Sequence, residues 1–545
     1  MESPDQKAQT STDEKAEAPL AGSIDPDNEI KGMTLVIINI ALILATFLTG
    51  LDFNIISTAI PTITSRFDSI KDVGWYGASF YIALCASQPL AGKTYILFSK
   101  KAVFALYLAV FEIGSIVCAT APTSRAFIAG RAVAGLGASG IFAGSLIVMT
   151  TIMPLHKRPI WQGMLNASFG VASIVGPLIG GAFTEKFSWR WCFWINLPIG
   201  GLAVAIILGM LKLKPAPAEQ APLFHKLKGL DGTGSALFAG AVTMLLLALQ
   251  WGGTLYTWDS ATIIGLFIGA GLIAIAFVVL EIHIGDQALI PSSIMTNRNV
   301  ILLSLGALFA NGPFQTIIYY LPIWFQVLGA SPVQSGVRYL PTVITDVVTS
   351  FASGAFAMMT GHWKPLLLFG NAVISIGSGL LTTLHPGTSS GKWIGYQILV
   401  GMGYPLVINM GQLGVQASLP PDIVHIGSTT LLFFMSISCA ICLAIGQTIF
   451  QLRLNDLLLQ IVSPTTVEEL LSSGARDLPS VVEPGNLAKV IQSYSSALTD
   501  VFFVPAVGPI LSFIFVFFTT WVLLKNKTTE KEGHQSESAV SESQR

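Results

Sequence analysis

Four ionisable residues lie inside long apolar segments, where side chains of this type are costly and therefore informative. They are Asp52, Glu112, Arg131 and Asp346. A charge at the centre of a bilayer costs about 3 kcal/mol, so such residues usually pair with each other or mark the path of a proton, an ion or a substrate. Each of the four is a candidate functional residue. The alternative for each is an internal ion pair that only fixes helix packing.

Asp52 and Arg131 are the strongest candidates for handling a proton. Thr49 and Asp52 are three residues apart and share one face of a helix. Apolar surroundings favour the protonated form of a carboxyl group, whereas a nearby arginine favours its ionised form, and this balance suits a group that changes its protonation state. We predict that Asp52, Arg131 and Glu112 are proton-coupling residues. The residues around Glu112 and Asp346 do not indicate a particular function for either acid.

Two other apolar segments carry stripes of amide and hydroxyl side chains. One stripe follows residues 311–319 at every fourth position beside Gly312-Pro313, and the other follows Tyr404-Pro405. Lipid penalises such stripes, so they should face protein or a wet cavity. Gly/Pro interruptions in apolar segments point to a binding site near the middle of the membrane. The alternative for each residue is a hydrogen bond between helices. The predicted cavity residues are Gln88, Asn311, Gln315, Tyr319, Asn409 and Gln412.

Small residues are concentrated in two segments. Segment 130–144 is rich in glycine, which lets helix backbones approach closely in lipid. In the second segment small residues recur at every fourth position, at Ser168, Ala172, Gly176, Gly180 and Thr184. This spacing predicts a ridge for a tight helix contact. Pro177 removes a backbone donor within that ridge, which predicts a bend in the helix.

The composition requires a membrane to solvate most of the chain. Of the 545 residues, 52% are hydrophobic and only 11% are charged, whereas soluble domains carry about 25% charged residues. A membrane helix needs about 20 apolar residues. This criterion predicts an all-α integral membrane protein of about fourteen spans: 34–57, 72–93, 101–120, 126–151, 160–184, 191–211, 231–250, 261–282, 299–325, 336–360, 364–384, 393–416, 428–451 and 502–524.

The loop charges predict the orientation of the spans. An even number of spans places both ends of the chain on one side, and basic residues favour the cytosolic side. Basic residues are more numerous in the loops on the side of the termini, and Lys525, Lys527 and Lys531 follow the last span. We therefore expect both termini in the cytosol, with a polar segment at 452–500 outside. Residues 1–33 are predicted to form a disordered cytosolic tail, since they are polar and lack an apolar signal segment.

Several other function classes lack support in the sequence. The net charge of −1 gives no attraction to nucleic acid. Gly92-Lys93-Thr94 resembles the end of a phosphate-binding loop, but Ser87 stands where that motif needs glycine. The histidines lack metal-ligand spacing, and Cys439 and Cys442 are best interpreted as small apolar residues in a membrane helix. We expect no enzymatic activity, no cofactor and no metal.

Six segments carry recognisable motifs. They are 51–61, which ends in Ala59-Ile60-Pro61, together with 130–140, 170–181, 189–200, 250–253 and 319–322. With these motifs the chain, over about residues 34–524, resembles the major facilitator superfamily, and within it the fourteen-span drug:proton antiporters, especially the fungal toxin-efflux branch. The resemblance implies that Arg131 belongs to the family's proton-coupling motif. It implies that Gly170, Gly176, Pro177, Gly180 and Gly181 form the antiporter motif, a signature of exporters.

Two positions depart from the family pattern. The loop between spans 2 and 3 of the superfamily usually carries an aspartate about four residues after its first glycine. Here that glycine corresponds to Gly92, and Ile96 stands at the acidic position. The charge network of this loop is therefore in question, although Lys100 and Lys101 remain. Asp346 is not expected from the family.

The resemblance implies two six-helix bundles that rock around a central cavity. The expected units are an N-terminal bundle at 34–211, a cytosolic loop at 212–230, two inserted linker spans at 231–282, a cytosolic loop at 283–298, a C-terminal bundle at 299–524 and a cytosolic tail at 525–545. The nearly uncharged polar stripes suit uncharged amphipathic organic molecules, such as a polyketide, a peptide-like toxin or an azole drug.

The expected function is proton-driven export of such small molecules across the plasma membrane by a monomer in the lipid bilayer. Two alternatives stay open. One is a proton-coupled carrier of amino acids or siderophores in the vacuolar or plasma membrane. The other is a transporter-like nutrient receptor, although such receptors usually carry longer cytosolic extensions.

Overall fold

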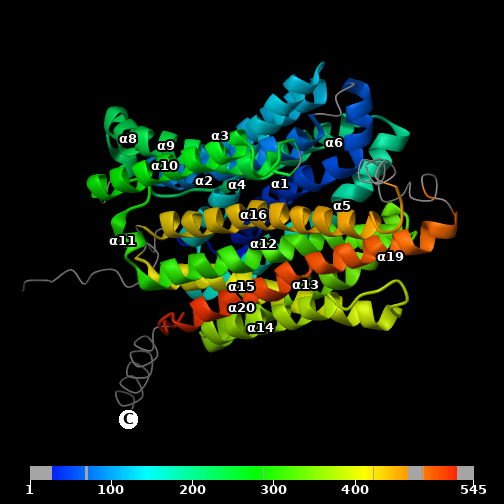
Figure 1. The fold of residues 1–545 in the computed structure, drawn as a ribbon. Helices are drawn as coiled ribbons and strands as arrows, with labels where there is room; N and C mark the ends of the chain where they lie inside the picture. The colour runs from blue at the N-terminus through cyan, green and yellow to red at the C-terminus, as the bar shows by residue number, and fades with distance from the viewer. Residues whose placement is uncertain are drawn as a thin grey trace, which may run out of the picture.

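The computed structural model describes residues 28–67, 72–215, 217–253, 255–285, 288–420, 423–463, 482 and 484–524. The protein is a bundle of long helices that run roughly side by side (Figure 1). Among the described residues there is no β-strand, only an isolated bridge between Gly252 and Tyr256. This confirms the predicted all-α fold.

The first half of the bundle holds the helices that carry the predicted proton-coupling residues. Its elements are α1 (Gly32–Phe67), α2 (Val73–Leu97), α3 (Lys100–Thr120), α4 (Ser124–Ile152), η3 (Leu155–Lys157), α5 (Arg158–Lys186), α6 (Trp191–Trp194) and α7 (Asn196–Met210). A linker follows, with η4 (Pro217–Gln220), α8 (Leu223–Gly229), α9 (Gly232–Trp251), α10 (Ala261–Ile284) and α11 (Ser292–Met295).

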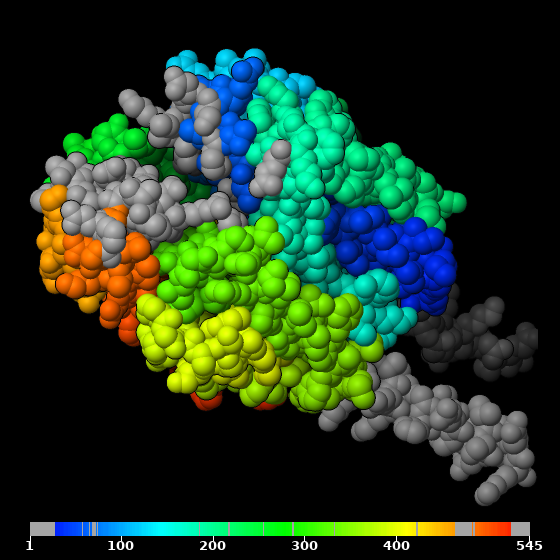
Figure 2. All heavy atoms as spheres, turned by 90° about the vertical axis from the view of Figure 1, so that its right-hand side faces the viewer, coloured from blue at the N-terminus to red at the C-terminus, as the bar shows by residue number. Residues whose placement is uncertain are grey.

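The second half repeats the arrangement of the first with helices α12 to α20. Its elements are α12 (Arg298–Val327), α13 (Pro332–Thr360), α14 (Lys364–Leu381), α15 (Ser390–Ser418), α16 (Val424–Leu458), α19 (Pro484–Val501) and α20 (Phe503–Phe517). The two halves occupy separate parts of the end face in Figure 2, blue to teal for the first and green to orange for the second.

Each predicted span overlaps one or two helices of the structure. Thirteen helices in the described part of the chain are long and apolar enough to cross a membrane. The further predicted span, 72–93, is the 25-residue helix α2. It contains Gln88 and Lys93, and it packs between α4, α9 and α16. Its polar side chains therefore face protein, which explains why its hydropathy is low for a membrane helix.

The last span differs from the prediction. The helical span runs from Gly485 to Phe517 instead of covering 502–524, and its apolar part is α20, Phe503–Phe517. The predicted polar loop at 452–500 is partly helical, because α16 continues to Leu458 and α19 begins at Pro484. The buried face of α19 packs on α12 and α16 through Val490, Tyr494, Ala497, Leu498 and Val501. Intervening polar residues hide this helical spacing from a hydropathy average. Residues 464–481 lie outside the described part.

Both described ends of the chain lie at the same end of the bundle, which we call the termini side. Ile30 N donates to Ile152 O over 3.1 Å, and Leu524 N donates to Gly361 O over 3.0 Å. Lys157 and Lys31 form salt bridges with Glu29 at 3.2 and 3.1 Å on this side. The predicted tails fall mostly outside the described residues, although α1 begins at Gly32 within the predicted tail 1–33.

The glycines of segment 130–144 form the predicted packing surface of α4. A Cβ atom at Gly137 would overlap the backbone of Phe111, and one at Gly114 would overlap the backbone of Ala134. The α3 and α4 backbones are therefore as close as two helices can be. In α5, the glycine ridge packs on α1, where a Cβ at Gly176 would lie 3.0 Å from Ile55 N. The helix stays continuous through Pro177.

Replacing Gly137 with alanine should destabilise the protein, because the new methyl group must separate α3 from α4. A shift of this kind costs about 1–3 kcal/mol in a packed core. The matched control is Gly265→Ala on α10, where a Cβ would meet nothing within 4 Å. Thermal unfolding in detergent should show a lower midpoint for the first variant only. Equal midpoints would contradict the packing role.

Candidate functional site

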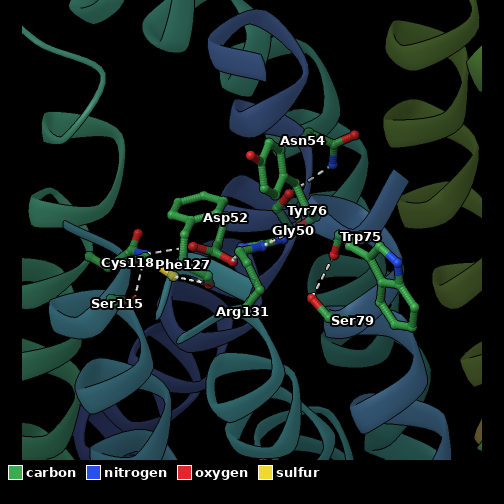
Figure 3. A network of polar contacts seen from close by, with 11 residues as sticks. Gly50, Asp52, Asn54, Trp75, Tyr76, Ser79, Ser115, Cys118, Phe127 and Arg131 are labelled. Atoms are coloured by element: carbon green, nitrogen blue, oxygen red, sulfur yellow. Dashed lines mark hydrogen bonds and ion pairs between the residues drawn. The ribbon is translucent and has the colours of Figure 1, made fainter. Parts of the chain in front are cut away.

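Asp52 of α1 and Arg131 of α4 form an ion pair inside the first half of the bundle (Figure 3). Neither side chain has any exposure. Arg131 Nη1 donates to Asp52 Oδ2, and Arg131 Nε donates to Tyr76 O over 2.9 Å. The guanidinium carbon lies 4.6 Å from the centre of the Phe80 ring. Both side chains were expected to meet, and the structure brings them together.

Asn196 is a third member of this site that the sequence reasoning did not assign a role. Its side-chain amide at the start of α7 donates to Asp52 Oδ1 over 3.1 Å and to Ser115 Oγ over 3.0 Å. The two oxygens of the Asp52 carboxylate are thus held by different helices, α4 and α7. An asparagine within an otherwise apolar helix start was the signal that could have found it.

Glu112 lies apart from the ion pair. Its carboxyl group packs against Gly200 of α7, where any side chain larger than hydrogen would overlap it. Neither carboxyl oxygen has a hydrogen-bond partner among the described residues. The structure therefore gives no direct contact between Glu112 and the Asp52–Arg131 pair, although all three were predicted to couple protons.

A central cavity of about 140 Å³ lies between the two halves. Four helices from each half line it: α1, α2, α4 and α5, and α12, α13, α15 and α16. Its walls carry eight aromatic rings, from Phe53, Phe80, Tyr81, Phe142, Phe169, Phe314, Tyr339 and Tyr404. Asp346 is the one lining residue in the described chain with an acidic or basic side chain. The cavity therefore suits a mostly apolar molecule that can pack against aromatic rings.

Four of the six predicted cavity residues line this space: Gln88, Asn311, Gln315 and Gln412. Asn311 is tied to its neighbours, because it donates to Met435 O over 2.9 Å and accepts from the Tyr404 hydroxyl over 2.8 Å. Both polar atoms of the Gln412 side chain are buried without a partner in the described residues. Gln412 can therefore bind a polar group of a molecule in the cavity.

Tyr319 and Asn409 do not line the cavity. Tyr319 is 57% exposed and packs edge-on against Tyr320 at 5.0 Å. It follows Gln315 by one turn, but the stripe leaves the cavity because spacing of four residues drifts around a helix of 3.6 residues per turn. Asn409 is fully buried and takes part in a contact between the two halves instead.

That contact closes the two halves against each other on the termini side. Asn166 and Gln162 of α5 donate to the side-chain oxygen and the backbone oxygen of Asn409, the latter over 3.3 Å. Gln416, two turns along α15, donates to Gln162 Oε1 over 3.4 Å and accepts from Arg158 over 3.5 Å. The five residues form a polar gate between α5 and α15.

Glycines allow the helices beside this gate to approach closely. A Cβ at Gly163 would lie 2.7 Å from Ser350 O, and one at Gly354 would lie 2.7 Å from Pro159 O. A Cβ at Gly92 would overlap the Thr429 side chain of α16. The described conformation is therefore closed at the termini side along both α5–α13 and α2–α16.

The linker provides acidic groups near the loop where Ile96 replaces the expected acid. Glu219 forms a salt bridge with Lys100 at 3.7 Å. Asp231 and Glu281 lie within electrostatic range of Lys93. Their carboxylates also accept from Leu289 N over 3.2 and 3.3 Å. Negative charge thus reaches this end of α2 and α3 from the linker instead of from the loop itself.

The antiporter-motif glycines face different neighbours. Gly176 and Gly180 pack on Ile55 of α1, whereas Gly181 meets nothing within 4 Å. Gly170 faces the cavity and the second half, where an added Cβ would lie 2.9 Å from Asp346 Oδ2. The motif therefore packs α5 on α1 with one face and brings α5 to α13 with the other.

The model of the Major Facilitator Superfamily matches residues 42–444. The chain is 41% identical to the efflux pump roqT of Penicillium rubens over 493 residues, which cover 90% of this chain and 92% of that protein. It is 38% identical to the efflux pump aflT of Aspergillus parasiticus, with 92% and 97% coverage. The chain therefore belongs to the major facilitator superfamily, and within it to the fungal efflux transporters.

Solved structures of low identity share the fold. The proton:xylose symporter XylE has a TM-score of 0.58 at 14% identity, with 90% of this chain and 97% of that chain covered. The human organic anion transporter MFSD10 has a TM-score of 0.57 at 14% identity, with 88% and 100% covered. At this identity the likeness supports the architecture of two bundles around a cavity and nothing about substrate.

Removing one partner of the buried ion pair should destabilise the protein more than removing both. Arg131→Gln leaves the Asp52 carboxylate buried with Asn196 alone, and breaking a buried pair costs about 3–5 kcal/mol. Adding Asp52→Asn should recover part of this loss. Unfolding midpoints of the two single variants and the double variant measure the coupling.

The exposed pair Arg453–Asp500, at 2.9 Å, is the control and should show coupling below about 1 kcal/mol. Strictly additive effects at Asp52 and Arg131 would contradict the pairing.

Widening the contact beside the gate should open the termini side. Gly354→Val places a side chain against Pro159 O, so α5 and α13 must separate. A reporter cysteine at Ser350, which is 1% exposed and lies one turn before Gly354, should then react faster with a maleimide. The control is Gly336→Val on the same helix, where a Cβ meets nothing within 4 Å. Unchanged labelling in Gly354→Val would argue against a closed gate.

Proposed function

We propose that this protein is a proton-coupled antiporter that exports small, mostly uncharged organic molecules from the cytosol. The observation that carries the proposal is the fully buried Asp52–Arg131 pair beside a nearly uncharged central cavity. The names of the relatives support export, since they include pumps such as the aspyridones efflux protein of Neocamarosporium betae, 38% identical. No bond chemistry and no cofactor are required for this function.

The ion pair and the cavity share structural elements. Asp52 lies between Thr49 and Phe53 on α1, and both of these line the cavity. Phe80 lies under the Arg131 guanidinium and also lines the cavity. Protonation of Asp52 weakens its attraction to Arg131, so the guanidinium and the Phe80 ring are free to move. A change in the charge of Asp52 therefore alters the position of residues that line the cavity, through direct contacts.

The proton gradient provides enough free energy for export with one proton. Entry of a proton along about 100 mV releases roughly 2.3 kcal/mol. A pH difference of about one unit adds roughly 1.4 kcal/mol. The sum of about 3.7 kcal/mol sustains a gradient of roughly 500-fold for a neutral solute. Coupling requires that proton and substrate bias the same conformational equilibrium in opposite directions.

The placement in the cell follows from the same proposal. Export from the producing cell places the protein in the plasma membrane, with the termini side in the cytosol, in agreement with the basic loops on that side. The gate is then a cytosolic gate, and the described conformation is closed to the cytosol. A single chain contains the whole cavity, so a monomer suffices for transport.

Replacing Asp52 with asparagine should abolish uphill export while the protein remains in the membrane. Asparagine keeps the shape of the side chain but carries no exchangeable charge. Transport of a tritiated uncharged azole, fluconazole, or of a labelled polyketide is measured in inside-out vesicles with an imposed proton gradient. Gradient-driven accumulation should fall at least about tenfold, whereas exchange without a gradient should continue. The control Asp500→Asn removes an exposed acid and should behave as wild type. Unchanged gradient-driven transport in the Asp52 variant would remove this residue from the mechanism.

A further inference from the structure

Asp346 is the cavity-lining acidic residue that the proposed mechanism leaves unused. It lies in α13, is only 7% exposed and lines the central cavity. Among the described residues it has no ion-pair or hydrogen-bond partner. The titratable groups that share the cavity with it are Tyr81, Tyr339, Tyr404 and Cys439, from α2, α13, α15 and α16. All four are neutral at physiological pH, so none of them balances a carboxylate.

The surroundings of Asp346 differ from those of Asp52 in one decisive respect. Asp52 has a guanidinium and an amide on its two oxygens, so both oxygens have polar partners and one partner is a cation. Gly170 of α5 lies against Asp346, and the residues that line the cavity with it are neutral, among them Ser173 from α5, Thr342 from α13, Gln315 from α12 and Tyr404 from α15. An unpaired buried carboxylate is costly, and such a group takes up a proton instead.

The contact with α5 connects this protonation to the conformation. Gly170 lies directly against Asp346 Oδ2, and Gly163 and Gly354 continue the α5–α13 contact toward the gate. Asp346 is therefore buried by the same helix contact that closes the termini side. When α5 and α13 separate, water reaches the carboxyl group and favours its ionised form. The closed conformation then binds one more proton at this position than the open conformation.

We propose that Asp346 is a second proton-carrying residue, located in the substrate cavity, whose protonated form closes α5 against α13. The inference rests on the proposed function and deepens it by adding a proton site in the second half. A proton from water on the outer side binds a carboxylate oxygen of Asp346 and forms an O–H bond. After the termini side opens, the same proton passes to cytosolic water and the carboxylate remains. The proton travels inward on the step in which no substrate is carried.

The sign of the pH dependence follows from linkage. Because the closed conformation binds the extra proton, its population rises as the pH falls and declines as the pH rises. One proton changes the ratio of closed to open conformers by up to about tenfold for each pH unit. Replacing Asp346 with asparagine removes this response and raises the closed population to a level that no longer depends on pH, since asparagine resembles the protonated acid.

The first test measures the conformation without any substrate. Spin labels at Lys157→Cys and Met359→Cys report the separation of the two halves on the termini side, and the five native cysteines are buried. Distance distributions are recorded between about pH 5.5 and pH 8 in the full-length protein. In the otherwise unaltered chain the short-distance population should fall as the pH rises. Asp346→Asn should show a short-distance population that stays the same at every pH. A response unchanged from that of wild type in this variant would overturn the proposal.

A second variant tests the same contact from the other helix. Gly170→Ala pushes a methyl group against Asp346 Oδ2 and should shift the closed-to-open transition to lower pH. Its matched control is Gly181→Ala in the same helix, where nothing lies within 4 Å. A shift of equal size in both variants would show that the change comes from the helix and would contradict a specific contact with Asp346.

The last test separates this inference from the proposed function. The number of protons exchanged per labelled fluconazole molecule is measured in vesicles, from the proton gradient that just balances an imposed substrate gradient. Wild type should exchange more protons than Asp346→Asn, which should retain coupled transport through Asp52. Equal stoichiometry in the two proteins would overturn the role of Asp346 alone. Absence of proton coupling in wild type would overturn the proposed function as well.

Discussion

The Asp52 carboxylate and the Arg131 guanidinium can each remain charged in this protein only because the other is in contact with it. Both are fully buried, and removing either partner leaves a charge that costs several kcal/mol. This requirement fixes α1 against α4, and Asn196 and Tyr76 O extend it to α7 and α2. The glycines of α4 make the arrangement possible, because they let α3 approach closely enough to enclose the pair. The rigidity of the first half thus follows from the cost of an unpaired charge.

The second half uses the opposite arrangement. Asp346 has no cation beside it, so its state depends on whether water reaches the cavity. Protonation of the paired and the unpaired acid has different consequences: at Asp52 it releases a fixed contact with Arg131, and at Asp346 it follows the opening and closing of α5 and α13. A proton at either carboxyl group can therefore bias the conformational equilibrium, through a different helix contact in each half.

Much of this architecture could be predicted from the chain itself. The helix positions follow from apolar segments of sufficient length, and the burial of Asp52 and Arg131 follows from their place within them. Other features depend on contacts that sequence spacing does not encode. Tyr319 and Asn409 share stripes with cavity residues, but Tyr319 lies on an exposed face and Asn409 contacts α5 of the other half in the gate. The helical nature of α19 was hidden by polar residues that average out its apolar face. The acids near Ile96 come from the linker, over a hundred residues away, so no local motif reveals them.

The chemistry of the gate explains how such a closed structure can open at all. Its contacts between the halves are hydrogen bonds of neutral amides, with Arg158 as the only charged member, and that side chain is also held within its own half by Thr150 O and Met153 O at 2.8 and 3.1 Å. A neutral hydrogen bond contributes about 1 kcal/mol net, since water replaces it when the partners separate. An ion pair across the same interface would leave two buried charges and a far higher barrier. The buried charged groups therefore either pair within one bundle or change their charge by binding a proton. The hydrogen bonds of the gate, which must break in every transport cycle, cost little free energy to break.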